Sequence, residues 1–258
     1  MDEIQLPSVL TKALLSPCLI GMASWIARQW GPNAGGWFAG LPLTSGPIIL
    51  ILALERGPDF AGEACIGTMQ AISSLCAFGL AYSWSAKRLA WGYSSVISCS
   101  VYAILLWPMQ FMPGRLGSAF LLVCAVLTVS LMCLPSEHTV ERTVEAGKPS
   151  SWDIPIRMIL GALLTVILTV SAKILGPRLA GLLTPFPIAA TILAASTHRA
   201  SGPFAAVRLL RSLIRGLLSF AIFFLVAGWL LKGGNVPLAF GAATLAAFVS
   251  HAILWRST

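Results

Sequence analysis

The chain has 258 residues, of which 57% are hydrophobic and 10% are charged, and its mean hydropathy is +0.85. These values exclude a soluble domain of this size and predict an all-α integral membrane protein in contact with the lipid bilayer. The formal net charge of +8 comes from Lys and Arg residues scattered between apolar runs, which is typical of loops that orient membrane helices and not of a nucleic-acid interface.

Hydropathy predicts nine membrane-spanning helices. The first resembles a signal peptide in its apolar character, but it begins with two acids instead of a basic region, so we expect it to remain as a span. In chain order the expected segments are residues 8–27, 34–54, 62–84, 89–107, 116–134, 154–174, 178–197, 204–231 and 236–255.

One long polar stretch, residues 135–153, separates the fifth and sixth segments and predicts a linker between two halves. The expected organisation is a first membrane repeat with an extra fifth helix (residues 1–134), the linker, and a second membrane repeat (residues 154–258). Alternate sides of the nine segments collect 6 and 11 Lys and Arg residues. Because the more basic side belongs inside, we expect an outside amino terminus, with the linker and the carboxyl terminus cytoplasmic.

An internal repeat underlies these two halves. Gly31-Pro32, Gly57-Pro58 and Trp84 recur 145 positions later, at Gly176-Pro177, Gly202-Pro203 and Trp229. Between the first two Gly-Pro pairs, the letters match best at an offset of about 140. Segments one to four then correspond to segments six to nine, and the extra fifth crossing makes the two four-helix repeats inverted in topology. If the interrupted segments re-entered the membrane instead of spanning it, the repeats would be parallel.

Each repeat contains one segment interrupted by proline and glycine. The first runs from Gly31 to Leu54 and the second from Gly176 to Ala195. Proline removes a helical hydrogen-bond donor, and irregular backbone at membrane depth is tolerated where it is buried in protein or lines a cavity. Two such broken helices predict a central site between the repeats, as in many secondary transporters.

The second half resembles the GlpM-type small bacterial membrane proteins, in the run RLAGLLTPFPIAATILAASTHRASG and the closing HAILW. The resemblance covers residues 157–255 and, through the internal repeat, residues 12–107 more weakly. It departs in the first half, where LPLTSGP replaces the Phe-Pro element, so no role of Phe186 transfers to that side. The resemblance implies the bacterial inner membrane. It also implies that a half-length relative pairs with an inverted copy of itself, as two fused copies would here, and a homodimer of the present chain is compatible with it.

The expected substrate-binding residues surround the two interruptions. The cations among them have a second interpretation as loop residues that set topology, and the hydroxyls have a second interpretation as donors to carbonyls freed by proline. The residues are Gly40, Pro42, Thr44, Ser45, Pro47, Gly181, Thr184, Pro185, Pro187, Arg28 and Lys173.

Other polar residues have structural interpretations that we favour over functional ones. Glu55-Arg56 and His198-Arg199, which end the two broken segments, are typical anchors at the membrane surface. His251 is expected to be a hydrogen-bonded histidine near the interface, although a histidine in an apolar segment is also a candidate for function. Arg208, Arg211 and Arg215 share one helical face, which we expect to lie against lipid phosphates.

Motifs of catalysis are missing from the sequence: there is no nucleophile elbow, phosphate-binding loop, zinc-protease helix or pair of acids within a segment. The six cysteines lack metal-ligand spacing and are typical of small core residues. We therefore expect no enzyme activity, no cofactor and no metal. The expected function is secondary transport or export of a small molecule, with an anionic metabolite or a lipid precursor as options. The alternative is a non-transporting scaffold or partner subunit in envelope-polymer synthesis.

Overall fold

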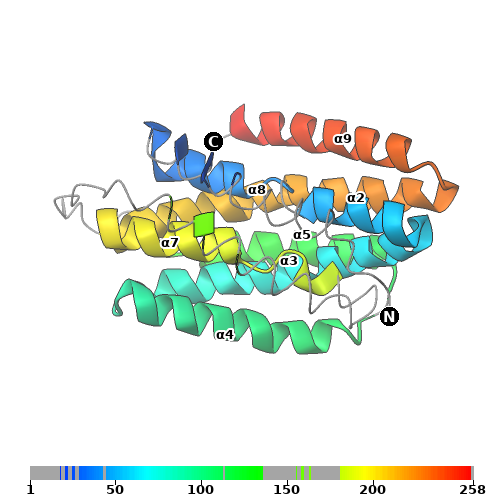
Figure 1. Ribbon diagram of the computed structural model, residues 1–258. Coiled ribbons are helices and arrows are strands. Elements are labelled where there is room, and N and C mark those ends of the chain that lie inside the picture. The colour runs from blue at the N-terminus through cyan, green and yellow to red at the C-terminus, as the bar shows by residue number, and fades with distance from the viewer. Residues whose placement is uncertain are drawn as a thin grey trace.

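The structure is a computed structural model, and every regular element in its described part is helical (Figure 1). The described residues are 18, 21–22, 25–26, 29–42, 45–112, 114–135, 155, 158–159, 163 and 181–256. The expected segments 8–27 and 154–174 therefore lie largely outside the described residues.

Five long apolar helices have the length and composition needed to cross a membrane. They confirm the expected segments 62–84, 89–107, 116–134, 204–231 and 236–255 to within a few residues. The helices are α3 (Pro58–Ser85), α4 (Trp91–Met109), α5 (Leu116–Cys133), α8 (Pro203–Leu230), which continues into the 3-10 turn η1 (Leu231–Gly233), and α9 (Val236–Arg256).

Two shorter helices precede α3 and α8. They are α2 (Ser45–Arg56) and α7 (Ile188–Ser201), and each is joined to its long neighbour by one glycine, Gly57 or Gly202. These two glycines have φ of 91° and 85°, and a proline begins the helix that follows each of them. The Gly57 amide donates to the Ala53 carbonyl and the Gly202 amide to the His198 carbonyl, at 3.1 and 3.0 Å. In both halves, a glycine with positive φ, followed by a proline in the first turn of the next helix, thus reverses the direction of the chain.

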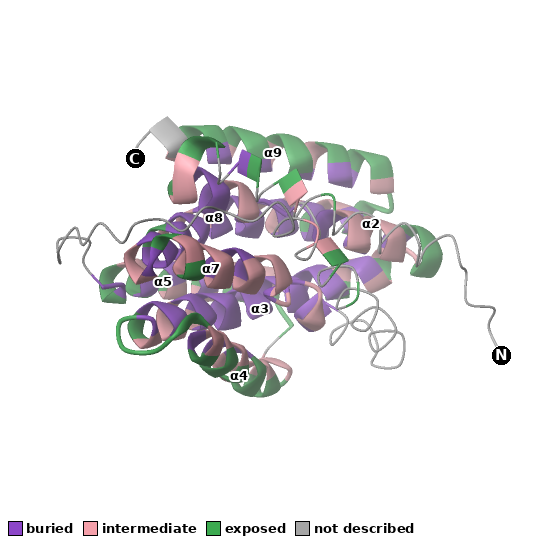
Figure 2. Cartoon of the chain, turned by 60° about the vertical axis from the view of Figure 1, so that its left-hand side comes forward, coloured by how far each residue is buried: buried purple, intermediate pink, exposed green. Residues whose placement is uncertain are grey.

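The centre of the bundle is the antiparallel pair of α3 and α8. Gly79 lies beside Ile214, and Gly228 lies beside Cys65, which fixes both the direction and the register of the two helices. The best membrane windows of α3 and α8 are 83% and 61% buried, whereas those of α4, α5 and α9 are 17%, 22% and 28% buried (Figure 2). The first two therefore form the core, and the last three expose apolar side chains toward lipid.

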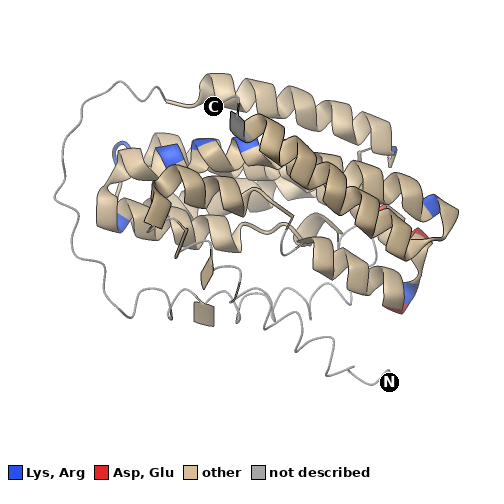
Figure 3. Cartoon of the chain, turned by 90° about the horizontal axis from the view of Figure 1, so that it is seen from above, with Lys and Arg blue, Asp and Glu red and all other residues tan. Residues whose placement is uncertain are grey.

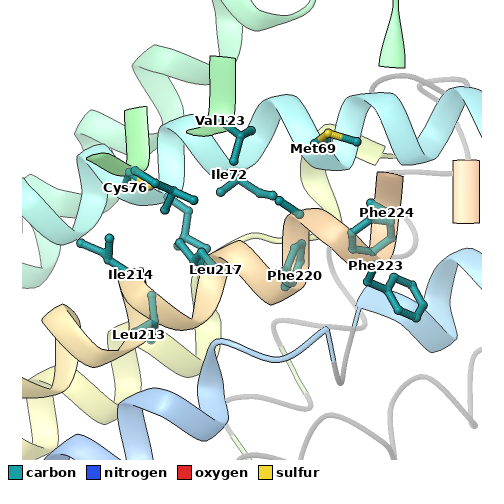
Figure 4. Close-up of a cluster of buried hydrophobic side chains, with 14 of the residues drawn as sticks. Met69, Ile72, Cys76, Val123, Leu213, Ile214, Leu217, Phe220, Phe223 and Phe224 are labelled. Carbon is teal, nitrogen blue, oxygen red and sulfur yellow. The ribbon is translucent and has the colours of Figure 1, made fainter. Parts of the chain in front are cut away.

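Side chains of α3, α5 and α8 interlock in this core. Figure 4 shows Ile72, Val123 and Leu217 converging on one another, and Cys76 and Ile214 continue the cluster along the helices. Lipid tails are as apolar as these side chains, so the cluster is stabilised mainly by close van der Waals packing.

The outer helices contact the opposite half of the sequence. Helix α4 packs beside α7, and α9 packs beside α2, in addition to their contacts with α3 and α8 respectively. In Figure 1, α4 and α9 lie on opposite flanks of the bundle. The halves are thus interleaved and do not stand as two separate bundles.

Charge is distributed unequally between the two ends of the bundle (Figure 3). The end where α3 begins and α8 finishes has three acids and three bases: Glu55, Asp59, Glu63, Arg56, Arg115 and Lys232. The other half of the bundle has seven bases and, among the described residues, no acid: Lys87, Arg88, Arg199, Arg208, Arg211, Arg215 and, as the last residue of α9, Arg256.

Candidate functional site

The first interruption lies between a helical stretch at residues 29–39 and the start of α2. The Gly40 amide closes that stretch by donating to the carbonyls of Gly36 and Trp37, at 3.1 and 3.0 Å. Pro42 is buried, and its carbonyl accepts from the Gly46 amide at 2.9 Å, in the first turn of α2. The described part of the break, Gly40 to Pro42 and the start of α2, is therefore packed within the bundle and hydrogen-bonded.

The second interruption runs from Thr184 to Pro187, immediately before α7. The Thr184 amide donates to the Gly181 carbonyl at 3.2 Å, and the Phe186 amide donates to the Leu183 carbonyl at 3.1 Å. Pro185 and Pro187 are both buried. Because proline has no amide hydrogen, these two positions end one helix without leaving a buried donor unpaired.

The two interruptions meet. The Ser45 hydroxyl, which is 1% exposed, donates to the Thr184 carbonyl with 3.5 Å between the oxygens. Ser45 is the first residue of α2, and Thr184 is four residues before α7. The amino-terminal ends of α2 and α7 therefore both lie close to the contact between Ser45 and Thr184, which joins the two halves.

Glycines allow each interrupted segment to pack against the long helix of the other half. A Cβ on Gly40 would stand 2.7 Å from the Gly216 Cα, and a Cβ on Gly36 would collide with the Leu209 carbonyl in the same helix, α8. On the other side, a Cβ on Gly181 would collide with the Ala64 carbonyl of α3. Only a residue without a side chain fits at such approaches of one backbone to another.

These contacts define which residues correspond. Gly36 with Leu209 and Gly181 with Ala64 are reciprocal pairs, because Gly181 follows Gly36, and Leu209 follows Ala64, by 145 positions. At the same offset of 145 positions, Pro42 corresponds to Pro187 in the sequence. Packing therefore makes Gly36 the counterpart of Gly181, whereas the letter match at an offset of about 140 pairs Gly181 with a residue near Gly40.

Two polar side chains supply donors to the backbone before the second interruption. The Thr68 hydroxyl donates to the carbonyls of Ala64 and Gly181, at 2.9 and 3.0 Å. The Tyr102 hydroxyl donates to the Leu182 carbonyl at 3.3 Å, and its ring meets the Phe186 ring edge-on at 5.3 Å. Sequence reasoning missed Thr68 and Tyr102. The signal available in the sequence was a polar side chain within an apolar segment, and the structure shows that both residues are fully buried.

A buried histidine lies against the first broken segment. The Nδ1 atom of His251 is 3.1 Å from the Ser219 hydroxyl, and its ring stacks at 4.1 Å on the Trp37 ring. Its Nε2 atom has no hydrogen-bond partner among the described residues. His251 is 8% exposed, so the expected hydrogen bond is confirmed, but the residue is buried between helices and not exposed at an interface.

The remaining candidate residues divide into three groups. Gly40, Pro42, Ser45, Gly181, Thr184, Pro185 and Pro187 belong to the two interruptions and the helix ends that meet there. Pro47 is half-buried in the first turn of α2. Arg28, Thr44 and Lys173 lie outside the described residues, so their expected roles stay predictions.

The charged residues that end the broken segments lie at opposite ends of the bundle, since α3 and α8 run antiparallel. Glu55 and Arg56 are exposed, and the Arg56 guanidinium lies 5.7 Å from the Phe60 ring centroid. At the other end, the Nδ1 atom of His198 is 3.4 Å from the Tyr82 hydroxyl. They therefore do not form a common gate.

The arginine face of α8 is partly engaged by protein. Arg211 donates to the Pro135 carbonyl at 2.6 Å, at the end of α5, whereas Arg208 is exposed and Arg215 is half-buried. No group of three metal-ligating side chains occurs in the described part of the chain. No protein-family model matches this sequence, and comparisons with curated proteins and with solved structures found no match either.

Proposed function

We propose that this protein is a small secondary transporter, with a central substrate site where the two interrupted segments meet. The observation that carries the proposal is the contact between Ser45 and Thr184, which joins one break to the other. Two broken helices that meet between related halves are the usual construction of a substrate site at the membrane midplane.

An inverted repeat is supported by the course of the segments. Gly36, Gly40 and Gly46 lie in turn beside Leu209, Gly216 and Phe223, so the first broken segment advances along α8 in one direction. The second follows α3 in the same way, from Gly181 beside Ala64 to His198 beside Tyr82. Because α3 and α8 are antiparallel, we infer that the two broken segments cross the membrane in opposite directions. With the expected spans 8–27 and 154–174, which lie largely outside the described residues, the proposed total is nine.

The meeting point lies close to the middle of the bundle. The register of α3 and α8 puts Ser74 level with Ser219, and these two residues are repeat counterparts. Gly46, next to Ser45, lies beside Phe223, about one helical turn from that level. A site at this depth is accessible from either side only if the packing around it rearranges, and Pro42, Pro185 and Pro187 are buried in the present, closed arrangement.

An anionic group is the substrate feature that this site favours. Helices α2 and α7 both begin at the breaks, so their amide donors and the positive ends of their dipoles point toward the same region. The three described carboxylates, Glu55, Asp59 and Glu63, all lie at one end of the bundle, away from it. We infer that the opposite end, whose described charged residues are all basic, faces the cytoplasm, in keeping with the expected orientation.

Reversible cross-linking of the two breaks tests the proposal. In a variant whose six native cysteines are replaced by alanine, Ser45→Cys and Thr184→Cys are joined by a short bifunctional thiol reagent. After reconstitution in proteoliposomes, uptake of radiolabelled organic anions from a broad panel should occur before cross-linking, stop after it, and return on reduction. The matched control joins Trp84→Cys to a restored Cys133, where the Trp84 indole already contacts the Cys133 carbonyl at 3.0 Å within the first half.

Flux that continues with Ser45→Cys joined to Thr184→Cys would overturn a site between the breaks. Absence of flux for every anion, together with a stably co-purifying protein partner, would favour the alternative of a scaffold or partner subunit.

A further inference from the structure

A second candidate site lies at the mixed-charge end of the bundle, away from the breaks. A cavity of about 680 Å³ opens between the start of α3, the start of α5 and the end of α8. Its polar lining consists of Glu63, Arg115 and Lys232, and its apolar lining includes Ile66, Leu225 and Trp229. We call these residues the end groove.

The three charged side chains of the end groove are free to bind a ligand. All three are exposed, and none forms a hydrogen bond or an ion pair with another residue in the described part of the protein. An acid and two bases around one cavity, without mutual ion pairs, present one anionic and two cationic groups to the same occupant.

The depth of the end groove matches an amphiphile at a membrane surface. Trp229 is 67% exposed in the last turn of α8, where an aromatic side chain marks the interface, and Lys232 follows it. Ile66 and Leu225 lie further along their helices, toward the apolar interior. A ligand seated here would have its polar head among the charges and an acyl chain along the aliphatic wall.

We propose that the end groove binds a phospholipid with a primary-amine headgroup, of the phosphatidylethanolamine class. Arg115 and Lys232 bind the phosphate, while Glu63 accepts hydrogen bonds from the ammonium group. Charge-assisted hydrogen bonds of this kind are short and strong, and a quaternary trimethylammonium group cannot make one because it has no N–H. A purely anionic lipid satisfies the two bases but leaves Glu63 opposite its phosphate without a cation.

Native mass spectrometry of the purified full chain tests this, with dioleoyl-phosphatidylethanolamine, -phosphatidylcholine or -phosphatidylglycerol added at equal concentration. We expect phosphatidylethanolamine to be retained about tenfold better than phosphatidylcholine, the ratio expected from one charge-assisted hydrogen bond. Phosphatidylglycerol should also be retained less well. Equal retention of the three lipids, or a preference for phosphatidylglycerol, would overturn the proposal.

Two sets of variants test which charged side chain of the end groove binds which part of the lipid headgroup. Glu63→Gln should abolish the preference for phosphatidylethanolamine over phosphatidylcholine, while Glu55→Gln, an exposed acid outside the groove at the same end, should leave it unchanged. Arg115→Gln with Lys232→Gln should reduce retention of all three lipids about tenfold, whereas Arg56→Gln with Lys87→Gln should not.

A lipid preference that survives Glu63→Gln would contradict the role of that carboxylate. Lipid retention is measured without flux, so its outcome is independent of the transport proposal.

Discussion

Gly36 and Gly181, 145 positions apart, each press against the backbone of the long core helix from the other half of the chain. Gly36 contacts Leu209 of α8, and Gly181 contacts Ala64 of α3. Neither contact is possible with a side chain at the glycine, so the pair joins the halves through backbone packing of the kind that small residues allow in membranes.

Replacing either glycine by alanine should destabilise the bundle to a similar extent. The added Cβ of Gly36→Ala or Gly181→Ala meets a carbonyl group of a core helix, which cannot move without shifting the helix. Overpacking of this kind costs about 1–3 kcal/mol, so the midpoint of thermal unfolding in detergent should fall by about 5 °C.

Gly62→Ala is the matched control for this prediction, because a Cβ at Gly62 has no neighbour within 4 Å. Its unfolding midpoint should stay the same or rise slightly, since alanine favours helix. A large loss at only one of Gly36 and Gly181 would contradict the reciprocal packing.

Removing the hydroxyl of Thr68 should loosen the second interruption. In Thr68→Val the side chain keeps its shape, but the Gly181 carbonyl loses one of its two donors and keeps the Thr184 amide. Because the Gly181 carbonyl then keeps only the longer bond from the Thr184 amide, and one net hydrogen bond contributes about 1 kcal/mol, the free energy of unfolding should fall by about that amount, and Thr68→Ser should restore most of it.

The same substitution at Thr128 controls for the change of residue type. Thr128 is exposed on α5, and its hydroxyl bonds only to the Cys124 carbonyl in its own helix. The free energy of unfolding of Thr128→Val should equal that of the unmodified protein to within about 0.5 kcal/mol. Equal effects at Thr68 and Thr128 would mean that the bond between Thr68 and Gly181 contributes nothing.

The long helices and the two interruptions could be predicted from the sequence, because hydropathy and proline report directly on membrane length and on lost backbone donors. The predicted segments 62–84 and 204–231 correspond to α3 and α8, with small differences at their ends. The pattern did not indicate that these two helices form the core. In a membrane both the buried and the lipid-facing sides of a helix are apolar, so hydropathy does not distinguish them.

Residue equivalence within the broken segments was harder to predict for a related reason. The shared letters Ala-Gly-Leu pair Gly181 with Gly40, whereas packing pairs it with Gly36. The physical requirement is a missing Cβ at the point of backbone approach, and any of several nearby glycines could meet it. Thr68 and Ser219 were missed because hydroxyls in apolar helices often bond only to their own backbone.

Alanine at Gly57 or Gly202 should disturb the hairpins before α3 and α8. Both glycines combine φ near 90° with an extended ψ, a conformation that is essentially confined to glycine. Each substitution should lower the free energy of unfolding by about 2 kcal/mol. Gly92→Ala is the control, because Gly92 lies in regular helix and a Cβ added there would have no neighbour within 4 Å. A drop at Gly92 equal to that at Gly57 would argue against strain as the cause.

His251 and Ser219 should be energetically coupled, since the Nδ1 atom of His251 is 3.1 Å from the Ser219 hydroxyl. The measurement is a double-mutant cycle with His251→Phe and Ser219→Ala, followed by thermal unfolding in detergent; phenylalanine keeps an aromatic ring against Trp37. Hydrogen bonds between membrane helices average about 0.6 kcal/mol, so the coupling energy should lie near that value and be favourable.

A second cycle pairs His251→Phe with Thr244→Val. Thr244 lies on the same helix, but its hydroxyl bonds to the Phe240 carbonyl, so the two changes should add. If the changes in free energy of unfolding caused by Ser219→Ala and His251→Phe also add, the polar contact does not stabilise the packing of α9 on α8. The position of His251 would then depend on its stacking against Trp37.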